Sequence, residues 1–348
     1  MAYIVIKLRL QWILLAVIVL TPKVFAADFG VGQREFTFED TLRNRKIFTH
    51  VWYPIDPSFK SVEIAQGPFQ PLLVSRNAPI ASMINGKLPV VFLSHGSGGS
   101  AERLFWLADF LVHKGVMVFA VNHPGNMQGD NSGMGLMRVW ERAKDFTFVV
   151  SQLMGTAEFK AKLDLDKLAV AGHSAGGTTA LLLAGARLSN RHFTNPIPKC
   201  AGSGDPYYEK LCAQLSKINY QAFSKKEVEG NYADSRVKSV VALDPGFVRS
   251  MNPESLKAMP AKALVFIADH LSEPQDEIHS KEFVQLLPRN ATEVTPNSTH
   301  MSFISACRPD VGKNDPELKI LCSDQDRKIA IQKAVAEKTY SFFLEVWK

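Results

Sequence analysis

The 348-residue chain lacks several features that mark specialised classes of protein. It has only four cysteines, no C-x-x-C pair and no histidine at ligand spacing near them, so neither a disulfide-built miniprotein nor a zinc site is indicated. It has no G-x-G-x-x-G and no G-K-S/T sequence, which argues against a phosphate-cradling loop. Internal repeats and low-complexity tracts are absent too. The remaining composition, 46% hydrophobic and 21% charged, is that of an ordinary globular enzyme or binding protein.

A strong excess of charge is also missing. The formal net charge is +6, and Lys7, Arg9 and Lys23 supply half of it within residues 1–26, which contain no acid. Residues 27–348 therefore carry +3. A basic surface for nucleic acid is not indicated.

Residues 1–26 have the pattern of a secretory signal peptide. Lys7 and Arg9 precede the mostly apolar run 10–20 (LQWILLAVIVL), and the segment closes on Ala26 with small or apolar residues at the −3 and −1 positions. A membrane anchor is the competing interpretation, but the run is short of the roughly 20 residues that span a bilayer. No later stretch is long and apolar enough to span a membrane. We therefore expect cleavage after Ala26 and a periplasmic or secreted protein.

Export would allow the four cysteines to form disulfides. Cys200 and Cys212 are 12 residues apart, and Cys307 and Cys322 are 15 residues apart. Four cysteines allow three connectivities. We favour the two local pairs, each of which closes a short loop.

Residues 27–348 contain no Pro/Ser-rich linker, so we expect one domain. Eight apolar or alternating runs predict strands, at 34–38, 47–53, 90–94, 116–121, 168–171, 239–243, 263–268 and 292–295. Helical patterns at 101–114, 138–153, 175–187, 277–287 and 326–347 follow or separate most of them. The first two strands are joined by a polar turn and should pair antiparallel at the sheet edge. The alternation predicts an α/β fold with a mostly parallel eight-stranded sheet and helices on both faces.

Two insertions break the alternation, one at 122–137 and one at about 188–236. Long insertions at the carboxyl ends of parallel strands surround the ligand crevice. We expect substrate-side loops or a lid. The alternative is a surface insertion without a function, which for the second insertion is equally compatible with the pattern.

The segment 168–180 (LAVAGHSAGGTTA) carries the strongest chemical signal. Gly172 to Gly176 matches G-x-S-x-G, with an apolar strand before it and a small-residue helix start after it. In that setting the serine sits on a sharp turn where neighbouring side chains have no room. Ser174 is the predicted nucleophile; an ordinary glycine-rich helix start is the alternative.

A serine hydroxyl needs a base to take its proton. His300 follows the last predicted strand, where the chain order serine, acid, histidine places the base. His173 adjoins Ser174 and should point away from it into the packing. His123 and His95 lie on loops near the same crevice, where a structural hydrogen bond is the default role.

Two acids could orient that histidine. Asp244 ends the strand at 239–243 before an abrupt Pro-Gly exit, and Asp269 ends the next strand. Both positions can reach His300, so the residues alone leave the choice open.

The run 90–100 (VVFLSHGSGGS) offers a site for an oxyanion. Glycines there leave backbone N–H groups unobstructed. We assign the N–H groups of Ser97 and Ala175, with Gly98 as the alternative to Ser97.

These segments resemble the α/β-hydrolase superfamily, and more narrowly the platelet-activating-factor acetylhydrolase and dienelactone-hydrolase-like group. The resemblance rests on 51–54 (VWYP), 93–96 (LSHG), 171–177, 242–245 (ALDP) and 299–300. It implies that Asp244 is the acid, and the cysteine pairs are similar to those of exported bacterial members. Dienelactone hydrolases use a cysteine nucleophile, which argues against their substrate here.

The predicted function is an exported serine hydrolase that cleaves carboxylic esters, short-acyl or lipid-like, through an acyl-enzyme. No cofactor or metal is expected, and the oligomeric state is left open. A serine peptidase or amidase on the same fold is the main alternative. A non-catalytic binding protein is the second.

Overall fold

The computed structural model describes residues 29–193, 209, 213–269, 287, 292–309, 311 and 316–348. The predicted signal peptide, Cys200, Cys212 and nearly all of the helix expected at 277–287 lie outside these residues. They stay predictions.

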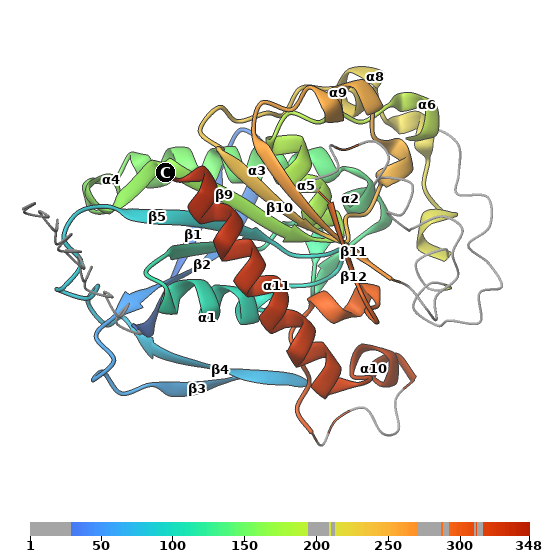
Figure 1. The fold of residues 1–348 in the computed structure, drawn as a ribbon. Coiled ribbons are helices and arrows are strands. Elements are labelled where there is room, and N and C mark those ends of the chain that lie inside the picture. Colours follow the sequence, from blue (N-terminus) through green and yellow to red (C-terminus); the bar gives the residue numbers. More distant parts are fainter. Residues whose placement is uncertain are drawn as a thin grey trace, which may run out of the picture.

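A large twisted sheet forms the centre of the described chain, with the strand order β12-β11-β10-β9-β5-β6-β2-β1-β4-β3 (Figure 1). The strands are β1 (Gly30–Asp40), β2 (Arg45–Ile55), β3 (Val62–Gln66), β4 (Phe69–Arg76), β5 (Leu88–Ser94), β6 (Met117–Val121), β9 (Leu163–His173), β10 (Ser239–Leu243), β11 (Lys262–Ala268) and β12 (Thr292–Thr295). From β6 to β12 each strand is parallel to its neighbour, whereas β2 is antiparallel to both β1 and β6. All eight predicted strands are present.

The sheet has two strands more than the sequence predicted. The hairpin β3–β4 adds beyond β1, so the β1–β2 pair is not the edge, as we expected. Strand β3 is half exposed and lacks a clear apolar pattern, and β4 contains Pro71 next to an irregular step in the β3–β4 register. Strand β4 lies between β1 and β3 and is not the edge strand. Proline, which has no N–H to donate, is tolerated there because the pairing is irregular at this point. Because of these features, the search for apolar or alternating runs did not predict β3 and β4.

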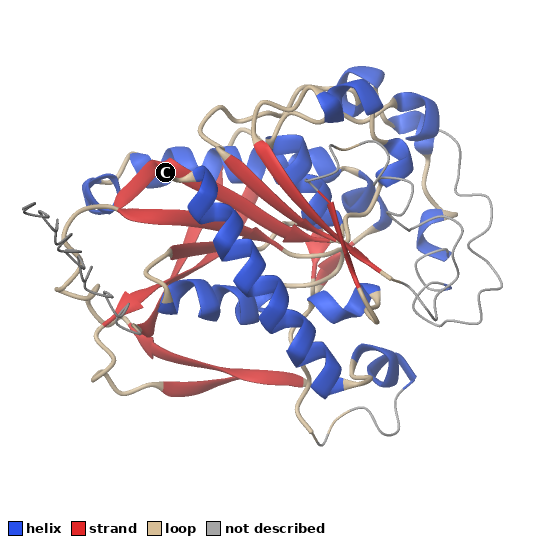
Figure 2. Ribbon diagram, viewed as in Figure 1, coloured by secondary structure: helices blue, strands red, loops and turns tan. Residues whose placement is uncertain are grey.

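Helices cover both faces of the sheet (Figure 2). One face carries α1 (Phe105–His113), preceded by the short η1 (Ala101–Leu104), and the long α11 (Gln325–Val346); the other carries α3 (Val139–Met154), α4 (Ala157–Lys162) and α5 (Ala175–Leu183). Smaller helices lie in the loops: α2 (Gly133–Met137), α6 (Asn190–Phe193), α8 (Lys225–Val228), α9 (Pro253–Lys257), α10 (Pro316–Leu321), η2 (Tyr220–Ala222), η3 (Val248–Ser250) and η6 (His300–Phe303). Helix α5 ends four residues earlier than predicted. Gly185 there adopts a left-handed φ of 111° that stops the helix.

Two apolar layers sandwich the sheet. Along β5, Val90 and Phe92 pack into the core under α3 and α5, while Val91 and Leu93 pack into the core under α1 and α11. A strand buried on both faces requires a continuous apolar run, which is the pattern that located β5, β6, β10 and β11 in the sequence. The layers fix the carboxyl ends of the parallel strands, from which the candidate site is built.

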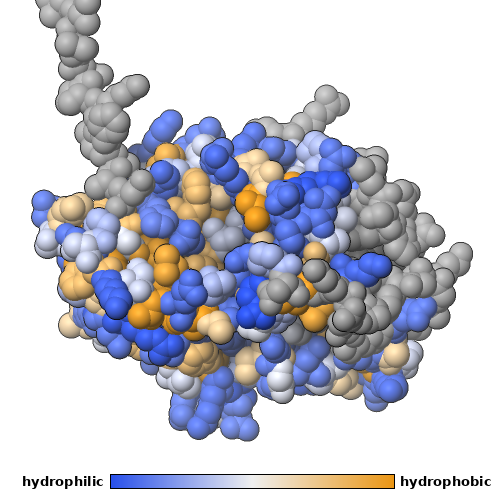
Figure 3. Space-filling view, turned by 90° about the horizontal axis from the view of Figure 1, so that it is seen from below, coloured by the Kyte–Doolittle hydropathy of each residue, from blue (hydrophilic) through white to orange (hydrophobic). Residues whose placement is uncertain are grey.

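In the view of Figure 3 hydrophobic patches are interrupted by hydrophilic side chains. Among the described residues no helix is both long and apolar enough to cross a membrane.

One of the two predicted disulfides is present: Cys307 is bonded to Cys322, with the two Cα atoms 5.4 Å apart. Cys307 also forms an isolated β-bridge with Phe69, the first residue of β4. The disulfide therefore joins the loop after η6 to the end of α10, and the β-bridge joins the same loop to the start of β4.

Candidate active site

Ser174 lies at a sharp turn between β9 and α5. Its backbone has φ 55° and ψ −120°, a conformation that residues other than glycine rarely adopt. The flanking glycines are required by space. An added Cβ would lie 2.2 Å from the carbonyl oxygen of Gly176 if placed at Gly172, and 1.8 Å from that of Ser94 if placed at Gly176.

The turn is also tied to β10. The Ser174 N–H donates to the carbonyl oxygen of Leu243 at 3.0 Å, and the Ser174 carbonyl accepts from the N–H of Gly246 at 3.0 Å. Asp244 lies between these two partners. The position of the serine and that of the acid are therefore coupled through the backbone.

His300 and Asp244 form a buried pair. Nδ1 of His300 lies 2.6 Å from Oδ2 of Asp244 at the start of η6. The other carboxylate oxygen of Asp244 accepts a hydrogen bond from the N–H of Ala268 at 3.1 Å. Asp244 has a left-handed φ of 42°, because β10 turns abruptly at its end. The carboxylate is thus held from both sides and aimed at the imidazole.

Asp269 is placed differently. Its backbone N–H donates to Oγ of Ser298 at 3.1 Å, and among the described residues its carboxylate forms no hydrogen bond or ion pair with His300. Of the two candidate acids, the structure brings Asp244 to the histidine.

Ser174 and His300 line the same cavity, of about 230 Å³. Its other described lining residues come from β4, the glycine loop after β5, η1, the two insertions, β9, and the segment from η6 to α10: Phe69, Gly96, Ser97, Gly98, Gly99, Arg103, Asn131, His173, Gln214, Met301, Ile304 and Leu321. Asn131 and Gln214 belong to the two insertions. Both insertions therefore contribute to the lining of the cavity that contains Ser174 and His300.

His173 has a more specific place than the packing role we predicted. Its ring lies 4.5 Å from the ring of His300, and its Nε2–H donates to the His300 backbone carbonyl at 2.9 Å. Burial, together with the nearby His300 ring, lowers the pKa of His173 to about 3. A neutral His173 thus fixes the backbone of the residue that carries the candidate base.

The glycine loop after β5 lines the cavity, and Ala175 directly follows Ser174 at the start of α5. Neither the N–H of Ser97 nor that of Ala175 is hydrogen-bonded to another described residue, while Gly99 donates to Gly96 at 3.1 Å and closes the loop. Gly98 has a left-handed φ of 64°. Unpaired donors at this edge can receive an anionic oxygen.

Arg142 of α3 supports this loop from beneath, a role that the sequence reading missed. The guanidinium is fully buried and donates to the carbonyl oxygens of His95 at 2.6 Å and of Asn126 at 3.2 Å. Burial lowers its pKa to about 9. Asn126 in turn donates to Oγ of Ser97 at 3.0 Å. The available signal was a charged residue on the apolar face of a predicted helix.

His95 and His123 complete the support, in the structural roles that we expected. The ring of His95 bonds the Gly96 carbonyl at 2.7 Å, and His123 bridges Ser94 and Asp145 at 2.9 and 3.1 Å. Burial lowers the pKa of both histidines, that of His123 to about 4.

A larger cavity of about 440 Å³ is lined in part by Arg142 and by neither Ser174 nor His300. Arg43 and Arg45 line it, and both pair with Asp145, at 2.9 and 2.7 Å. The positive charges of Arg43 and Arg45 are thus neutralised by an acidic side chain of the same fold. Within the described residues no cluster of histidine, cysteine and acidic side chains is suited to hold a metal ion.

The sheet order, the helices on both faces and the serine turn define an α/β-hydrolase fold. Residues 87–275 match the model of the family described as serine aminopeptidase, S33. Since this stretch is more than half of the chain, the chain belongs to that hydrolase family.

A ferulic acid esterase from Streptomyces cinnamoneus has a similar structure, with a TM-score of 0.55 over 91% of this chain and 90% of that one at 20% sequence identity. At this identity the likeness concerns the fold. No curated protein matches the sequence.

Proposed function

We propose that the protein is a serine hydrolase that cleaves carboxylic esters through an acyl-enzyme. The hydrolase family and the candidate site support this function. The observation that carries it is the buried His300–Asp244 pair, whose histidine lines one cavity with Ser174 on its strained turn. The N–H group of Ser97 in that lining and the N–H group of Ala175, next to Ser174, have no hydrogen-bond partner among the described residues.

In the proposed reaction Oγ of Ser174 attacks the ester carbonyl carbon. His300 takes the serine proton through Nε2 and passes it to the leaving alcohol, and Asp244 holds the imidazolium that forms in between. The N–H groups of Ser97 and Ala175 stabilise the negative oxygen of the tetrahedral intermediate. Water then attacks the acyl-serine with His300 as base, which releases the acid and restores the serine.

The volume of the cavity, about 230 Å³, is below the range typical of pockets for drug-sized ligands. This small volume favours esters with short acyl groups. The resemblance to the acetylhydrolase group points the same way and extends the proposal to lipid-like esters. The predicted signal peptide and the Cys307–Cys322 disulfide support a periplasmic or secreted location.

Aminopeptidase activity is the second candidate, because the family description names it. An aminopeptidase has to bind the ammonium group of its substrate, and an acid beside the nucleophile would do so. The described lining of the cavity contains no aspartate or glutamate but contains Arg103. We therefore prefer an ester to a peptide substrate.

Replacing Ser174 with alanine tests the proposal. We expect hydrolysis of p-nitrophenyl acetate to fall by about 10³-fold or more, while the melting temperature stays within a few degrees. Aminoacyl p-nitroanilides assayed in parallel separate esterase from aminopeptidase. Turnover that survives the substitution would refute the nucleophile. A chain that neither turns over nor reacts with a fluorophosphonate would be a binding protein.

A further inference from the structure

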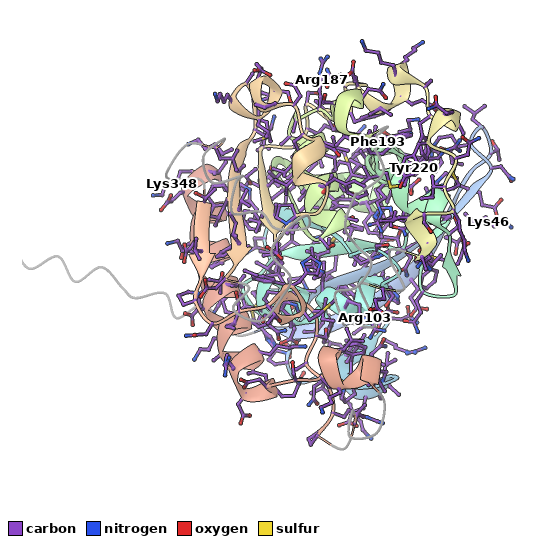
Figure 4. The ribbon with its side chains drawn as sticks, turned by 90° about the vertical axis from the view of Figure 1, so that its right-hand side faces the viewer. Lys46, Arg103, Arg187, Phe193, Tyr220 and Lys348 are labelled. Carbon is purple, nitrogen blue, oxygen red and sulfur yellow. A yellow bond between two sulfur atoms is a disulfide. The ribbon has the colours of Figure 1, made fainter. Side chains whose placement is uncertain are left out.

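The candidate active-site cavity contains one permanently charged side chain among its described lining residues, that of Arg103 in η1 (Figure 4). The remaining lining is apolar, glycine or neutral polar apart from the two histidines. A positive charge is therefore built into the wall of the space where the proposed substrate binds.

Arg103 is fixed in place without an acidic partner. Its guanidinium lies 3.5 Å from the centre of the Phe69 ring, and Nη2 donates to Oε1 of Gln128 at 2.9 Å. No carboxylate of the described residues forms an ion pair with it. Its neighbour Glu102 turns to Nε2 of His50, 2.9 Å away.

The surroundings leave this charge only partly compensated. Burial lowers the pKa of Arg103 to about 10, and only the nearby Glu102 opposes the shift, so the group is still cationic at neutral pH. A partly desolvated cation without a counter-ion is unfavourable, and an anion that enters the cavity would offset that cost. A carboxylate fits the planar guanidinium fork and matches its single charge.

The fold does not need the side-chain charge to hold the backbone here. The Arg103 carbonyl accepts the backbone N–H of Ser305 at 2.8 Å and the Ser305 hydroxyl at 3.1 Å, and both bonds survive replacement of the side chain. Stacking on Phe69 can be kept by another long side chain. Neither the backbone hydrogen bonds nor the stacking on Phe69 requires a charged side chain. We therefore take the charge of Arg103 to serve the binding of a ligand.

We propose that Arg103 binds a carboxylate of the substrate, so that the preferred substrates are esters with a free carboxylate elsewhere in the molecule. This inference rests on the proposed ester hydrolysis. The carboxylate can belong to the acyl part, as in a half-ester of a dicarboxylic acid, or to the alcohol part. Both give the same recognition by Arg103.

Two matched substrate pairs test the proposal with the disulfide-intact protein. Monoethyl and diethyl glutarate differ by one carboxylate on the acyl side, and 4-acetoxybenzoate and its methyl ester differ by one on the alcohol side. We expect kcat/KM to be higher for the anionic member of at least one pair. Arg103→Met should lower kcat/KM for that member by about 10- to 100-fold and for the neutral member by less than about threefold.

Arg103→Lys serves as the conservative variant and should recover part of the preference. Arg187→Met, at an exposed site away from the cavity (Figure 4), should leave both pairs unchanged. In addition, inhibition of p-nitrophenyl acetate hydrolysis by free benzoate should weaken in Arg103→Met. If Arg103→Met fails to fold, the wild-type preference for the anionic substrates and its partial recovery in Arg103→Lys still test carboxylate recognition.

Two results would overturn the inference and differ from each other. Equal rates on both members of each pair, or equal losses on both in Arg103→Met, would reject carboxylate recognition while ester hydrolysis stands. No hydrolysis of any of these esters, together with no fluorophosphonate labelling, would reject the proposed function and the inference with it.

Discussion

Asp244 owes its orientation to two contacts on opposite sides of its carboxylate. The Ala268 N–H holds one oxygen and the His300 imidazole holds the other. Asp269, one strand further along the sheet, has no such geometry. Asp244 and Asp269 both follow the end of a strand, but only at Asp244 does the backbone turn direct the carboxylate toward His300.

Asparagine substitutions distinguish the two acids. Asp244→Asn should lower kcat for p-nitrophenyl acetate by about 10³- to 10⁴-fold, because an amide neither fixes the correct tautomer of His300 nor stabilises its cation. Asp269→Asn is the matched control and should change kcat by less than about threefold. The reverse ranking would reassign the acid.

Arg142 is the second residue whose chemistry can be tested by itself. Arg142→Lys keeps the charge but cannot reach both carbonyls, so the loop that holds Ser97 should loosen. We expect kcat to fall by about 10- to 100-fold with little change in KM. Lys144→Gln on the same helix is the control. An unchanged kcat in Arg142→Lys would mean that the loop is rigid without the guanidinium.

At residue scale the sequence indicated the candidate residues but not their contacts. Ser174, His300 and the two candidate acids follow from a local motif and from chain order. The choice of Asp244 depended on resemblance, since a carboxylate's direction is set by backbone angles that the sequence does not encode locally. Arg142 and the His173–His300 contact were missed because each joins segments that are distant in sequence.

At the scale of elements, the C-terminal loops and the edge hairpin form one wall of the cavity. Phe69 of β4 packs with Met301, Ile304 and Cys307, and the Cys307–Cys322 bond closes this group. Phe69 is also the residue on which Arg103 stacks. The disulfide therefore stabilises both the fold and the shape of the site.

Replacing Cys307 and Cys322 together by serine should lower the free energy of unfolding by about 3 kcal/mol, as expected for a loop of this length. KM for p-nitrophenyl acetate should rise, because the wall made by Met301 and Ile304 loosens. Chemical denaturation and steady-state kinetics measure the two effects. A variant with wild-type stability and KM would show that the loop is held by packing alone.

The predictability of elements depended on burial. Strands buried on both faces gave unbroken apolar runs and were found, whereas the exposed edge strand β3 and the half-buried β4 beside it were not. The first insertion contains α2 and a short β-ribbon (Asn126–Met127 with Asp130–Asn131), and neither was predicted because the insertion has no periodic pattern of apolar residues. Turn-rich segments take their shape from contacts with the rest of the fold.

At the scale of the whole molecule, several buried histidines link stability to pH. Burial lowers the pKa of His173 to about 3 and of His123 to about 4, from an ordinary value of 6.5. Between these values the unfolded chain binds more protons than the folded one. Stability should therefore rise with pH in this window and be lost as the pH falls below about 6.5.

Urea unfolding at pH 7.5 and pH 5 measures this linkage. We expect a lower free energy of unfolding at pH 5, and a smaller difference in His173→Gln. His113→Gln, on the surface end of α1, should keep the wild-type difference. Equal stability at the two pH values in the wild-type protein would mean that the histidines are not buried in their neutral forms.

The central claim is that the Ser174 hydroxyl becomes nucleophilic beside His300. Mass-spectrometric mapping after treatment with a fluorophosphonate tests it most directly. We predict one adduct per chain, on Ser174, and a large loss of labelling in His300→Gln. An adduct on another residue, or none on the folded wild-type protein, would contradict the claim.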